Sequence, residues 1–408
     1  MELAEYKKRT RFVIQLGNAL HGCGASSQRV EKHLGNVTRM LDMNGHFMFT
    51  PTGLTSAFWL DDEFDQYVHI ERVEPGDINL GRLWMIDELI ESMSRGKIPL
   101  DEGIEKLSQL AKSPSLYSPW IQALTWAITG GAFAALISGT REDVGVSAFL
   151  SVVTYALFYI SIRRNRLMPL LTILSPFVSG VLAQSIYALG LPINVPFVIL
   201  SSILVFIPGL SLTVAMSEIS ARHLISGSSR LVESIMNLLL LLFGAIMGVS
   251  VALLFWKSMA PTTAPVMLVA WKTWPAVLLL SLSLSIAFNI PIRKCMWGSI
   301  ACCIAYASAS AGGSAFGVVA GMFLGALAVG VFSNAFARFT KAPSSVLSTQ
   351  GIILLVPGST TYLILNQWVN GTPIIAGSET SSQALMMFVS LVAGLLFANA
   401  LLPAGKSL

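Results

Sequence analysis

The sequence has very few acidic residues over most of its length. Of its 22 Asp and Glu residues, 17 lie within residues 1–119, and only five follow in the rest of the chain. These five are Glu142, Asp143, Glu218, Glu233 and Glu379. Charged residues make up 12% of the chain and hydrophobic residues 54%, whereas soluble domains are about a quarter charged. A chain this apolar cannot bury all of its hydrophobic residues in one soluble core, and we expect lipid to surround most of the chain.

Sequence signals of several other protein classes are also missing. No Walker loop and no GxSxG elbow occur, which argues against ATP-driven transport and against hydrolysis, and we expect no enzyme activity. No basic stripe with interleaved aromatic residues suggests nucleic-acid binding. The histidines lack metal-ligand spacing, so neither a metal nor a cofactor is expected. The four cysteines do not form a disulfide framework, and we interpret them as small buried side chains.

The composition changes near Lys112–Trp120, and this step predicts three domains. Residues 1–119 form an α+β domain, which we place in the cytosol because no apolar signal region precedes it. Residues 120–256 and 257–408 each form one membrane repeat. Helices in the first domain are expected at Leu3–His21, from Ser26 or Ser27 to about Met43, at Leu80–Arg95 and at Leu100–Lys112, and strands at Phe47–Thr52, Thr55–Leu60 and Tyr67–Val73.

Ten apolar segments are long enough to be candidate membrane spans, since a spanning helix needs about 20 mostly apolar residues. They are Trp120–Gly139, Val144–Ile162, Leu167–Leu189, Val195–Ser217, Ile235–Phe255, Trp274–Pro291, Cys295–Gly313, Phe316–Ala337, Val346–Asn366 and Ala384–Leu402. With a cytosolic N-terminus, the inside loops carry ten Lys and Arg and the outside loops three. This excess predicts a multi-pass protein of the cell (inner) membrane with both termini in the cytoplasm.

A repeated motif links the fourth and ninth segments. Pro208-Gly209 and Pro357-Gly358 lie 149 residues apart, each near the middle of an apolar segment. We therefore expect an all-α membrane region of ten helices in two five-helix repeats. Five is odd, so the second repeat must be inverted relative to the first, which is a common construction of secondary transporters. The alternative is a chance match, since Pro and Gly are frequent in spanning helices.

The Pro-Gly pairs also predict where a solute binds. Proline removes a hydrogen-bond donor and glycine adds freedom, so each helix should break there and expose a half-helix N-terminus that favours a carboxylate. Hydroxyl groups follow each break, and such a site suits a small zwitterion with its own hydroxyl. The expected binding residues are Pro208, Gly209, Ser211, Thr213, Pro357, Gly358, Ser359, Thr360 and Thr361. The alternative is a kink that serves only packing.

No acidic residue lies clearly at the bilayer centre, where a charge would point to function. Coupling or gating is therefore assigned to Glu218 and Glu233 at the cytosolic ends of spans, and to Gln367, which aligns with Glu218 in the repeat. For both glutamates the alternative is an ordinary solvated carboxylate. Small residues spaced by four, at Gly244 with Gly248 and at Gly317, Gly321 and Gly325, predict close helix packing.

The stretch Leu20-His-Gly-Cys-Gly-Ala-Ser-Ser-Gln-Arg-Val-Glu31, then Asn79–Leu83 and Gly96–Leu107, resembles the threonine/serine exporter family in its fused two-half form. The resemblance implies proton-driven export of threonine and serine, and it carries over no catalytic residues. Separate-chain relatives suggest small dicarboxylates such as succinate as an alternative substrate. A receptor or scaffold with a signalling cytosolic domain is a third hypothesis. The expected partners are the small-molecule substrate, protons and the lipid bilayer, and homo-oligomerisation is left open.

Overall fold

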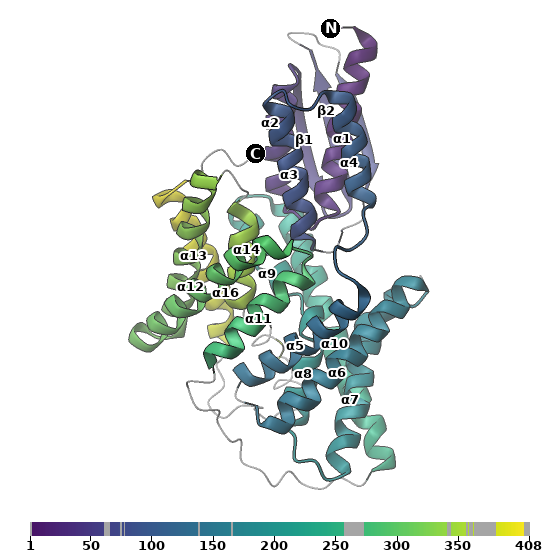
Figure 1. Ribbon diagram of the computed structural model, residues 1–408, viewed down its shortest axis with the longest axis vertical. Helices are drawn as coiled ribbons and strands as arrows, with labels where there is room; N and C mark the ends of the chain where they lie inside the picture. Colours follow the sequence, from purple (N-terminus) through teal and green to yellow (C-terminus); the bar gives the residue numbers. More distant parts are fainter. Residues whose placement is uncertain are drawn as a thin grey trace.

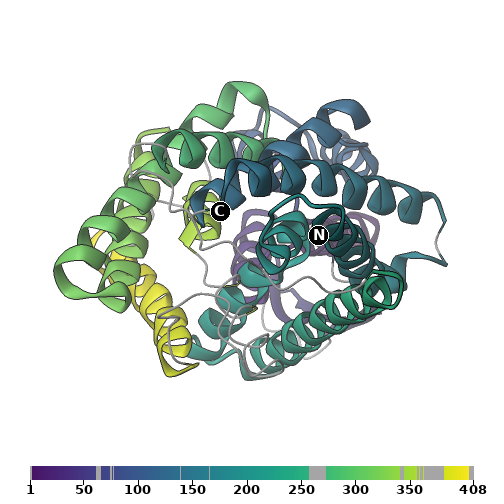
Figure 2. The same ribbon diagram turned by 90° about the horizontal axis from the view of Figure 1, so that it is seen from below.

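The computed structural model describes residues 2–60, 66–73, 76, 78–137, 139–164, 166–256, 273–340, 344–355, 358, 362 and 381–403. An N-terminal domain stands at one end of a bundle of helices (Figure 1). Within the bundle, the helices of residues 119–255 lie on one side and those of residues 273–401 on the other. The same division is seen from below in Figure 2.

The N-terminal domain combines four helices with a three-stranded antiparallel sheet of order β1-β2-β3. Its elements are α1 (Leu3–His21), α2 (Ser27–Met40), β1 (Asn44–Thr50), β2 (Gly53–Trp59), β3 (Tyr67–Arg72), α3 (Leu80–Ser94) and α4 (Leu100–Lys112). In α2, Val30, Leu34 and Val37 recur at helical spacing, and all three are fully buried in the domain core. The elements predicted from periodicity and turn residues are confirmed within a few residues at each end.

The first half of the bundle follows a short linker. It consists of α5 (Pro119–Leu136), α6 (Arg141–Arg163), the short η1 (Met168–Leu170), α7 (Leu171–Ala188), α8 (Val195–Ser202), the short η2 (Leu204–Phe206), α9 (Gly209–Ser220) and α10 (Leu224–Phe255). Thr140 and Asp143 form a capping box at the start of α6. The Asp143 carboxylate also accepts a hydrogen bond from the Asn194 amide at 2.7 Å. Asp143 is buried, and its carboxylate holds the α7–α8 connection against α6.

The second half contains α11 (Thr273–Ala287), α12 (Ile292–Phe316), α13 (Val318–Thr340), α14 (Ser344–Leu355) and α16 (Ser381–Leu401). Helical structure thus lies at every predicted segment. Among the described residues, however, five helices are long and apolar enough to cross a membrane, or six if the bent pair α8–α9 counts as one span. The count of ten spans stays a prediction.

One helix extends well beyond its predicted membrane span. The fifth span was expected to begin at Ile235, but α10 begins at Leu224 and is 32 residues long. Its extra turns are rich in serine and polar residues, so hydropathy alone did not include them. Arg222, with a φ of 66°, turns the chain sharply between α9 and α10. The N-terminal end of α10 can then pack back along α9.

The two halves repeat the same pattern of helix contacts. In the first half, α6 packs against α7 and α8, and α7 packs against α10. In the second half, α12 packs against α13 and α14, and α13 packs against α16. These pairs correspond position by position along the repeat. The opposite insertion of the halves in the membrane stays a prediction.

Glycines allow the closest of these contacts. A Cβ on Gly244 would lie 2.3 Å from the Ile173 carbonyl oxygen, and one on Gly248 would lie 2.2 Å from that of Phe177. Gly321 and Gly325 are similarly close to backbone atoms of α12. The packing prediction is confirmed for these four. It is wrong for Gly317, which has nothing within 4 Å and makes the α12–α13 turn with a φ of 89°.

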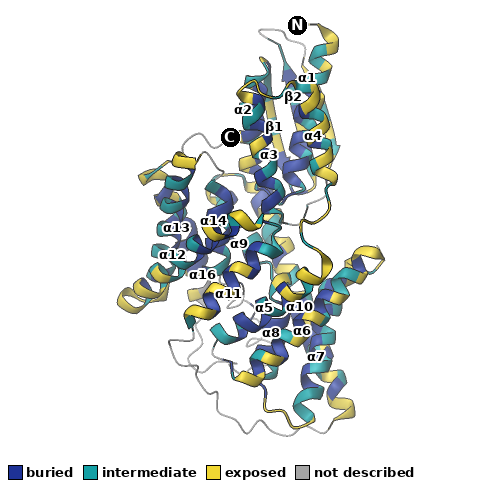
Figure 3. Cartoon of the chain, viewed as in Figure 1, coloured by how far each residue is buried: buried dark blue, intermediate teal, exposed yellow. Residues whose placement is uncertain are grey.

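Large apolar side chains cover the outside of the bundle. Leu254 is 81% exposed, Phe255 79% and Phe339 88%. Figure 3 shows exposed residues along the outer sides of the helices and buried residues between them. Water would penalise so much exposed apolar surface, whereas a bilayer accommodates it. The four cysteines are unpaired, and three of them are buried.

Candidate functional site

The fourth segment is interrupted at its Pro-Gly pair, as the sequence predicts, and a bend precedes this interruption. The axis of α8 and that of the stretch from Leu204 to Ser220 differ by 60°, with the break at Ile203. Ile207 is extended, with φ −69° and ψ 120°, because the residue before a proline is disfavoured in the helical region. Pro208 is then the N-cap of α9, and Gly209 is the first residue of that helix.

The two Pro-Gly motifs meet in the bundle. A Cβ built on Gly358 would lie 2.8 Å from the Cα of Gly209 and 3.1 Å from Cγ2 of Ile207. Ordinary carbon contacts are about 3.5–4.0 Å, so only glycine fits at position 358 without a shift. Tyr362, four residues after Gly358, is also buried in a cluster of mostly first-half residues. Gly209 and Gly358, 149 residues apart in the sequence, therefore lie in contact, and we call this contact the crossing.

The hydroxyl groups near the crossing have different surroundings. Thr213 is buried, and its hydroxyl donates to the Gly209 carbonyl oxygen at 3.2 Å. That bond occupies its proton, whereas Ser211 is half-buried and makes no side-chain hydrogen bond within the described part of the chain. Pro357, Ser359, Thr360 and Thr361 lie outside the described residues.

Neighbouring helices provide hydrogen bonds to the backbone that the break releases. Helix α8 stops at Ser202, so its last carbonyl groups have no partner within the helix. The Thr154 hydroxyl of α6 donates to the Ser202 carbonyl oxygen at 3.0 Å. Between the halves, the Thr129 hydroxyl donates to that of Ser283 at 2.9 Å. The interior around the break is therefore polar, which a hydrophobic kink would not require.

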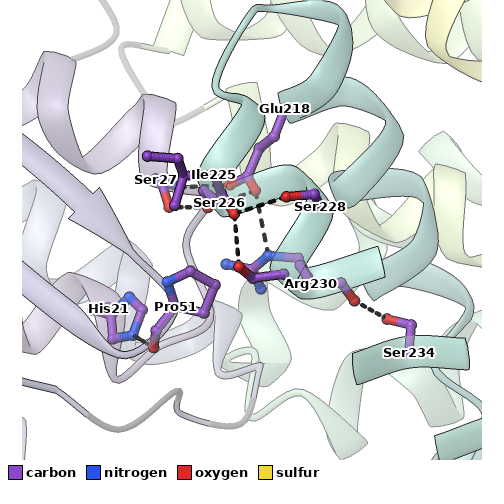
Figure 4. A network of polar contacts seen from close by, with 10 residues as sticks. His21, Ser27, Pro51, Glu218, Ile225, Ser226, Ser228, Arg230 and Ser234 are labelled. Carbon is purple, nitrogen blue, oxygen red and sulfur yellow. Dashed lines mark hydrogen bonds and ion pairs between the residues drawn. The ribbon is translucent and has the colours of Figure 1, made fainter. Parts of the chain in front are cut away.

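At the other end of α9, Glu218 is bound to the N-terminal domain (Figure 4). Its Oε1 accepts from the Ser27 backbone amide at 2.8 Å. Its Oε2 accepts from the Ser226 hydroxyl at 2.8 Å and lies 3.5 Å from Nε of Arg230. The Ser27 and Ser226 hydroxyls are 2.6 Å apart. Glu218 is 1% exposed, so its interpretation as a solvated carboxylate is wrong.

Charged groups of the N-terminal domain extend this network. Glu31 lies 3.5 Å from Nδ1 of His223, which starts α10, and also accepts from the Phe49 amide at 2.8 Å. Burial raises the pKa of the Glu31 carboxyl, although the Phe49 amide and His223 oppose that shift.

Another acidic residue of the N-terminal domain, Asp87, lies on α3. Burial, supported by the nearby charge of Glu91, raises the pKa of Asp87 to about 7. Asp87 can therefore change its charge near neutral pH.

A second contact joins the N-terminal domain to the other half of the bundle. The Gly81 amide donates to the Phe288 carbonyl oxygen at 3.3 Å, and a Cβ on Gly81 would lie 1.8 Å from the Asn289 carbonyl oxygen. Lys294 binds Glu88 at 2.5 Å and lies 4.0 Å from the ring centroid of Trp84. The domain therefore contacts α9 and α10 of the first half and the α11–α12 turn of the second.

The other two predicted coupling residues are not part of this network. Glu233 is exposed on α10 and forms no ion pair with another described residue, and Gln367 lies outside the described residues. Sequence reasoning missed Ser27, Ser226 and Arg230 as partners of Glu218. Ser27 was noted only as a candidate cap of α2, and its hydroxyl instead contacts Ser226. Ser27 and Glu218 are 191 residues apart along the chain, so no local sequence pattern could have predicted their contact.

Comparison with known proteins agrees with this two-half construction. A model of the threonine/serine exporter family matches residues 11–252, and a second model, described as "Threonine/Serine exporter, ThrE", matches residues 275–401. The chain belongs to the threonine/serine exporter family. It carries both family segments in one chain, as the sequence resemblance implied. It is accordingly a membrane protein of an exporter family.

Curated relatives of this exporter-family chain occur in yeasts. Pheromone-regulated membrane protein 10 of Candida albicans is 25% identical over 94% of this chain and 35% of its own length. The protein of the same name in Debaryomyces hansenii is 24% identical over 61% of this chain and 25% of its own length. That of Saccharomyces cerevisiae is 22% identical over 100% of this chain and 56% of its own length. The chain thus spans about a quarter to about half of these relatives. No solved structure matches it.

Proposed function

We propose that this protein is a secondary active exporter of small hydroxy amino acids, threonine and serine, with the solute bound at the crossing of the two Pro-Gly segments. The observation that carries the proposal is the contact between Gly209 and Gly358. A crossing of two interrupted segments at the interface of two similar halves is the usual location of a transporter's solute site.

The proposed site has groups suited to each part of the solute. The amides of Leu210 and Ser211, in the first turn of α9, have no acceptor within that helix and favour a carboxylate. The Ser211 hydroxyl, together with Ser359, Thr360 and Thr361 in the sequence of the second half, suits the hydroxyl and ammonium groups. No Lys or Arg occurs between Val195 and Ser220. A dicarboxylate would lack a second cationic partner there.

Proton antiport is the coupling that we propose, with Glu218 as a gating residue. Glu218 accepts hydrogen bonds from Ser27 and Ser226 at one end of the helix that begins at Gly209. Breaking these bonds would loosen the N-terminal domain from α9 and bias the position of that helix. We place this domain in the cytoplasm and the bundle in the cell (inner) membrane.

Threonine efflux from proteoliposomes tests this function and its site. The chain should export threonine and serine, faster with an opposing proton gradient, and succinate should not compete. Altering Pro208, Gly209, Pro357 or Gly358 singly should reduce efflux. Gly145→Ala is the matched control, because a Cβ there meets nothing within 4 Å. Undiminished, gradient-dependent efflux in all four variants would refute the site. Competition by succinate but not by serine would favour a dicarboxylate exporter.

A further inference from the structure

A cavity of about 260 Å³ lies within the N-terminal domain, far along the chain from the proposed transport site. Helices α1, α3 and α4 enclose it. The lining residues that matter here are Gln15, Asn18, Arg82, Ser108, Ala111 and Lys112. Its volume is slightly below the usual range for drug-sized ligands, about 300–1,000 Å³. It therefore has room for only a small metabolite.

Three buried polar atoms of the lining residues have no hydrogen-bond partner among the described residues. They are Oε1 of Gln15, Oδ1 of Asn18 and Nε of Arg82. The Asn18 amide orientation is set, because its Nδ2 donates to Glu71 at 3.0 Å. Arg82 is held in place by a 2.7 Å bond from Nη2 to the Ser113 carbonyl oxygen. Buried polar atoms are nearly always paired in proteins, so these three atoms, on residues that line one cavity, are candidate hydrogen-bond partners of a molecule bound there.

The two sides of the cavity carry opposite chemistry. Arg82 on α3 and Lys112 on α4 supply positive charge, and Ser108 adds a hydroxyl. On α1, Gln15 and Asn18 supply amide oxygens, which accept hydrogen bonds. A simple anion would leave the amide oxygens unpaired, and a simple cation would be repelled by Arg82 and Lys112. A ligand with both a carboxylate and an ammonium group satisfies both sides.

From these observations we infer that the cavity is a binding site for a free small α-amino acid, separate from the transport site. The carboxylate binds Nε of Arg82 and the Lys112 ammonium, and the amino group donates to Gln15 and Asn18. The site does not depend on which solute the bundle transports. It gives the N-terminal domain, whose function the fold alone leaves open, a sensing role.

The position of Arg82 connects this site to the membrane bundle. Its neighbour Gly81 donates to Phe288, at the turn before α12. Its own guanidinium binds Ser113, which begins the linker to α5. An amino acid that reorients Arg82 therefore acts on both connections at once. Amino-acid concentration on the side of the N-terminal domain can thus modulate the bundle.

Hydrogen exchange of the full-length protein in lipid nanodiscs locates such binding without relying on transport. Threonine or glycine should slow exchange in peptides covering the second half of α1 and the C-terminal end of α4. Acetate, methylammonium and phosphate should each bind at least about tenfold more weakly, because each satisfies only one side of the site. If the protein does not transport threonine but threonine still protects these peptides from exchange, the proposed function is wrong and this binding site is supported.

Two variants test the location. Ala111→Phe fills the cavity from an exposed position, and Lys112→Met removes a cation, so both should abolish the protection or weaken binding at least about tenfold. Gln109→Phe is the matched control, because Gln109 is exposed on α4 and does not line the cavity. This variant should keep the protection by threonine. The inference is overturned if no amino acid protects these peptides, which would indicate a water-filled cavity. It is also overturned if Ala111→Phe stays protected, or if phosphate protects as well as threonine.

Discussion

Replacing Glu218 tests how the N-terminal domain is held on the bundle. In Glu218→Ala, the buried Ser27 amide and Ser226 hydroxyl lose their acceptor, and Arg230 loses its partner. Removing one member of a buried ion pair typically costs about 3–5 kcal/mol. Because Glu218 is 1% exposed, little solvent screening reduces that cost. We expect the domain to detach from α9 much more often than in the wild type.

Glu218→Gln separates the charge from the hydrogen bonds. The glutamine oxygen can still accept from the Ser27 amide, and its NH₂ group can donate to Ser226, whose hydroxyl then turns toward Ser27. The charge-assisted part of two hydrogen bonds and the ion pair with Arg230 are lost. Since charged hydrogen bonds contribute about 1 kcal/mol more than neutral ones, the expected cost is about 1–3 kcal/mol.

Hydrogen exchange at the start of α2, measured in nanodiscs, reports this docking. Exchange of the Ser27 amide should accelerate strongly in Glu218→Ala and moderately in Glu218→Gln. Glu233→Ala is the matched control, because Glu233 is an exposed carboxylate on the adjacent helix, and surface changes usually stay within about 0.5 kcal/mol. Equal exchange in Glu218→Ala and Glu233→Ala would refute the reasoning.

Three further predictions concern other contacts. Gly358→Ala places a Cβ 2.8 Å from the Gly209 Cα, and overpacking of about 1–3 kcal/mol should cut threonine efflux about tenfold. In the control Gly313→Ala the new Cβ meets nothing within 4 Å, so efflux should not fall. Equal efflux rates in the two variants would contradict the crossing. Gly248→Ala, with its Cβ 2.2 Å from the Phe177 oxygen, should lower the thermal midpoint, and an unchanged midpoint would argue against the tight α7–α10 contact. Asp87, with a pKa raised to about 7 from 3.8, binds its proton more tightly when folded, so stability should fall as pH rises between those values. In Asp87→Asn the thermal midpoint should change less between pH 5 and 7 than in the wild type. An unaltered change of the midpoint with pH would exclude Asp87 as the cause of this pH dependence.

Local sequence patterns were sufficient for most elements. The serines at positions 26 and 27 located the start of α2 as candidate caps, and strand-like runs located the sheet. The interruption at Pro208-Gly209 was also predictable, because proline and glycine act on their own backbone. The same local reasoning missed the start of α10, since the turns after Leu224 are polar and are held by contact with α9.

Long-range contacts account for what the sequence did not reveal. Glu218 was assigned an interfacial position because it lies about 15 Å along a helix from Pro208. Its burial depends on the Ser27 amide, 191 residues earlier in the chain. Gly317 was misplaced for the same reason, because its surroundings depend on how helices are connected in space. The meeting of Gly209 and Gly358, in contrast, follows from the repeat only if both halves pack symmetrically.

Substrate protection at the crossing tests the central claim most directly. A Ser211→Cys variant, in a background with the four native cysteines replaced, is labelled with a small water-soluble thiol reagent in proteoliposomes. If threonine binds between the Pro-Gly segments, threonine and serine should slow labelling at concentrations that saturate efflux, and leucine should not. Labelling that is unaffected by threonine, in a variant that still exports it, would contradict this account.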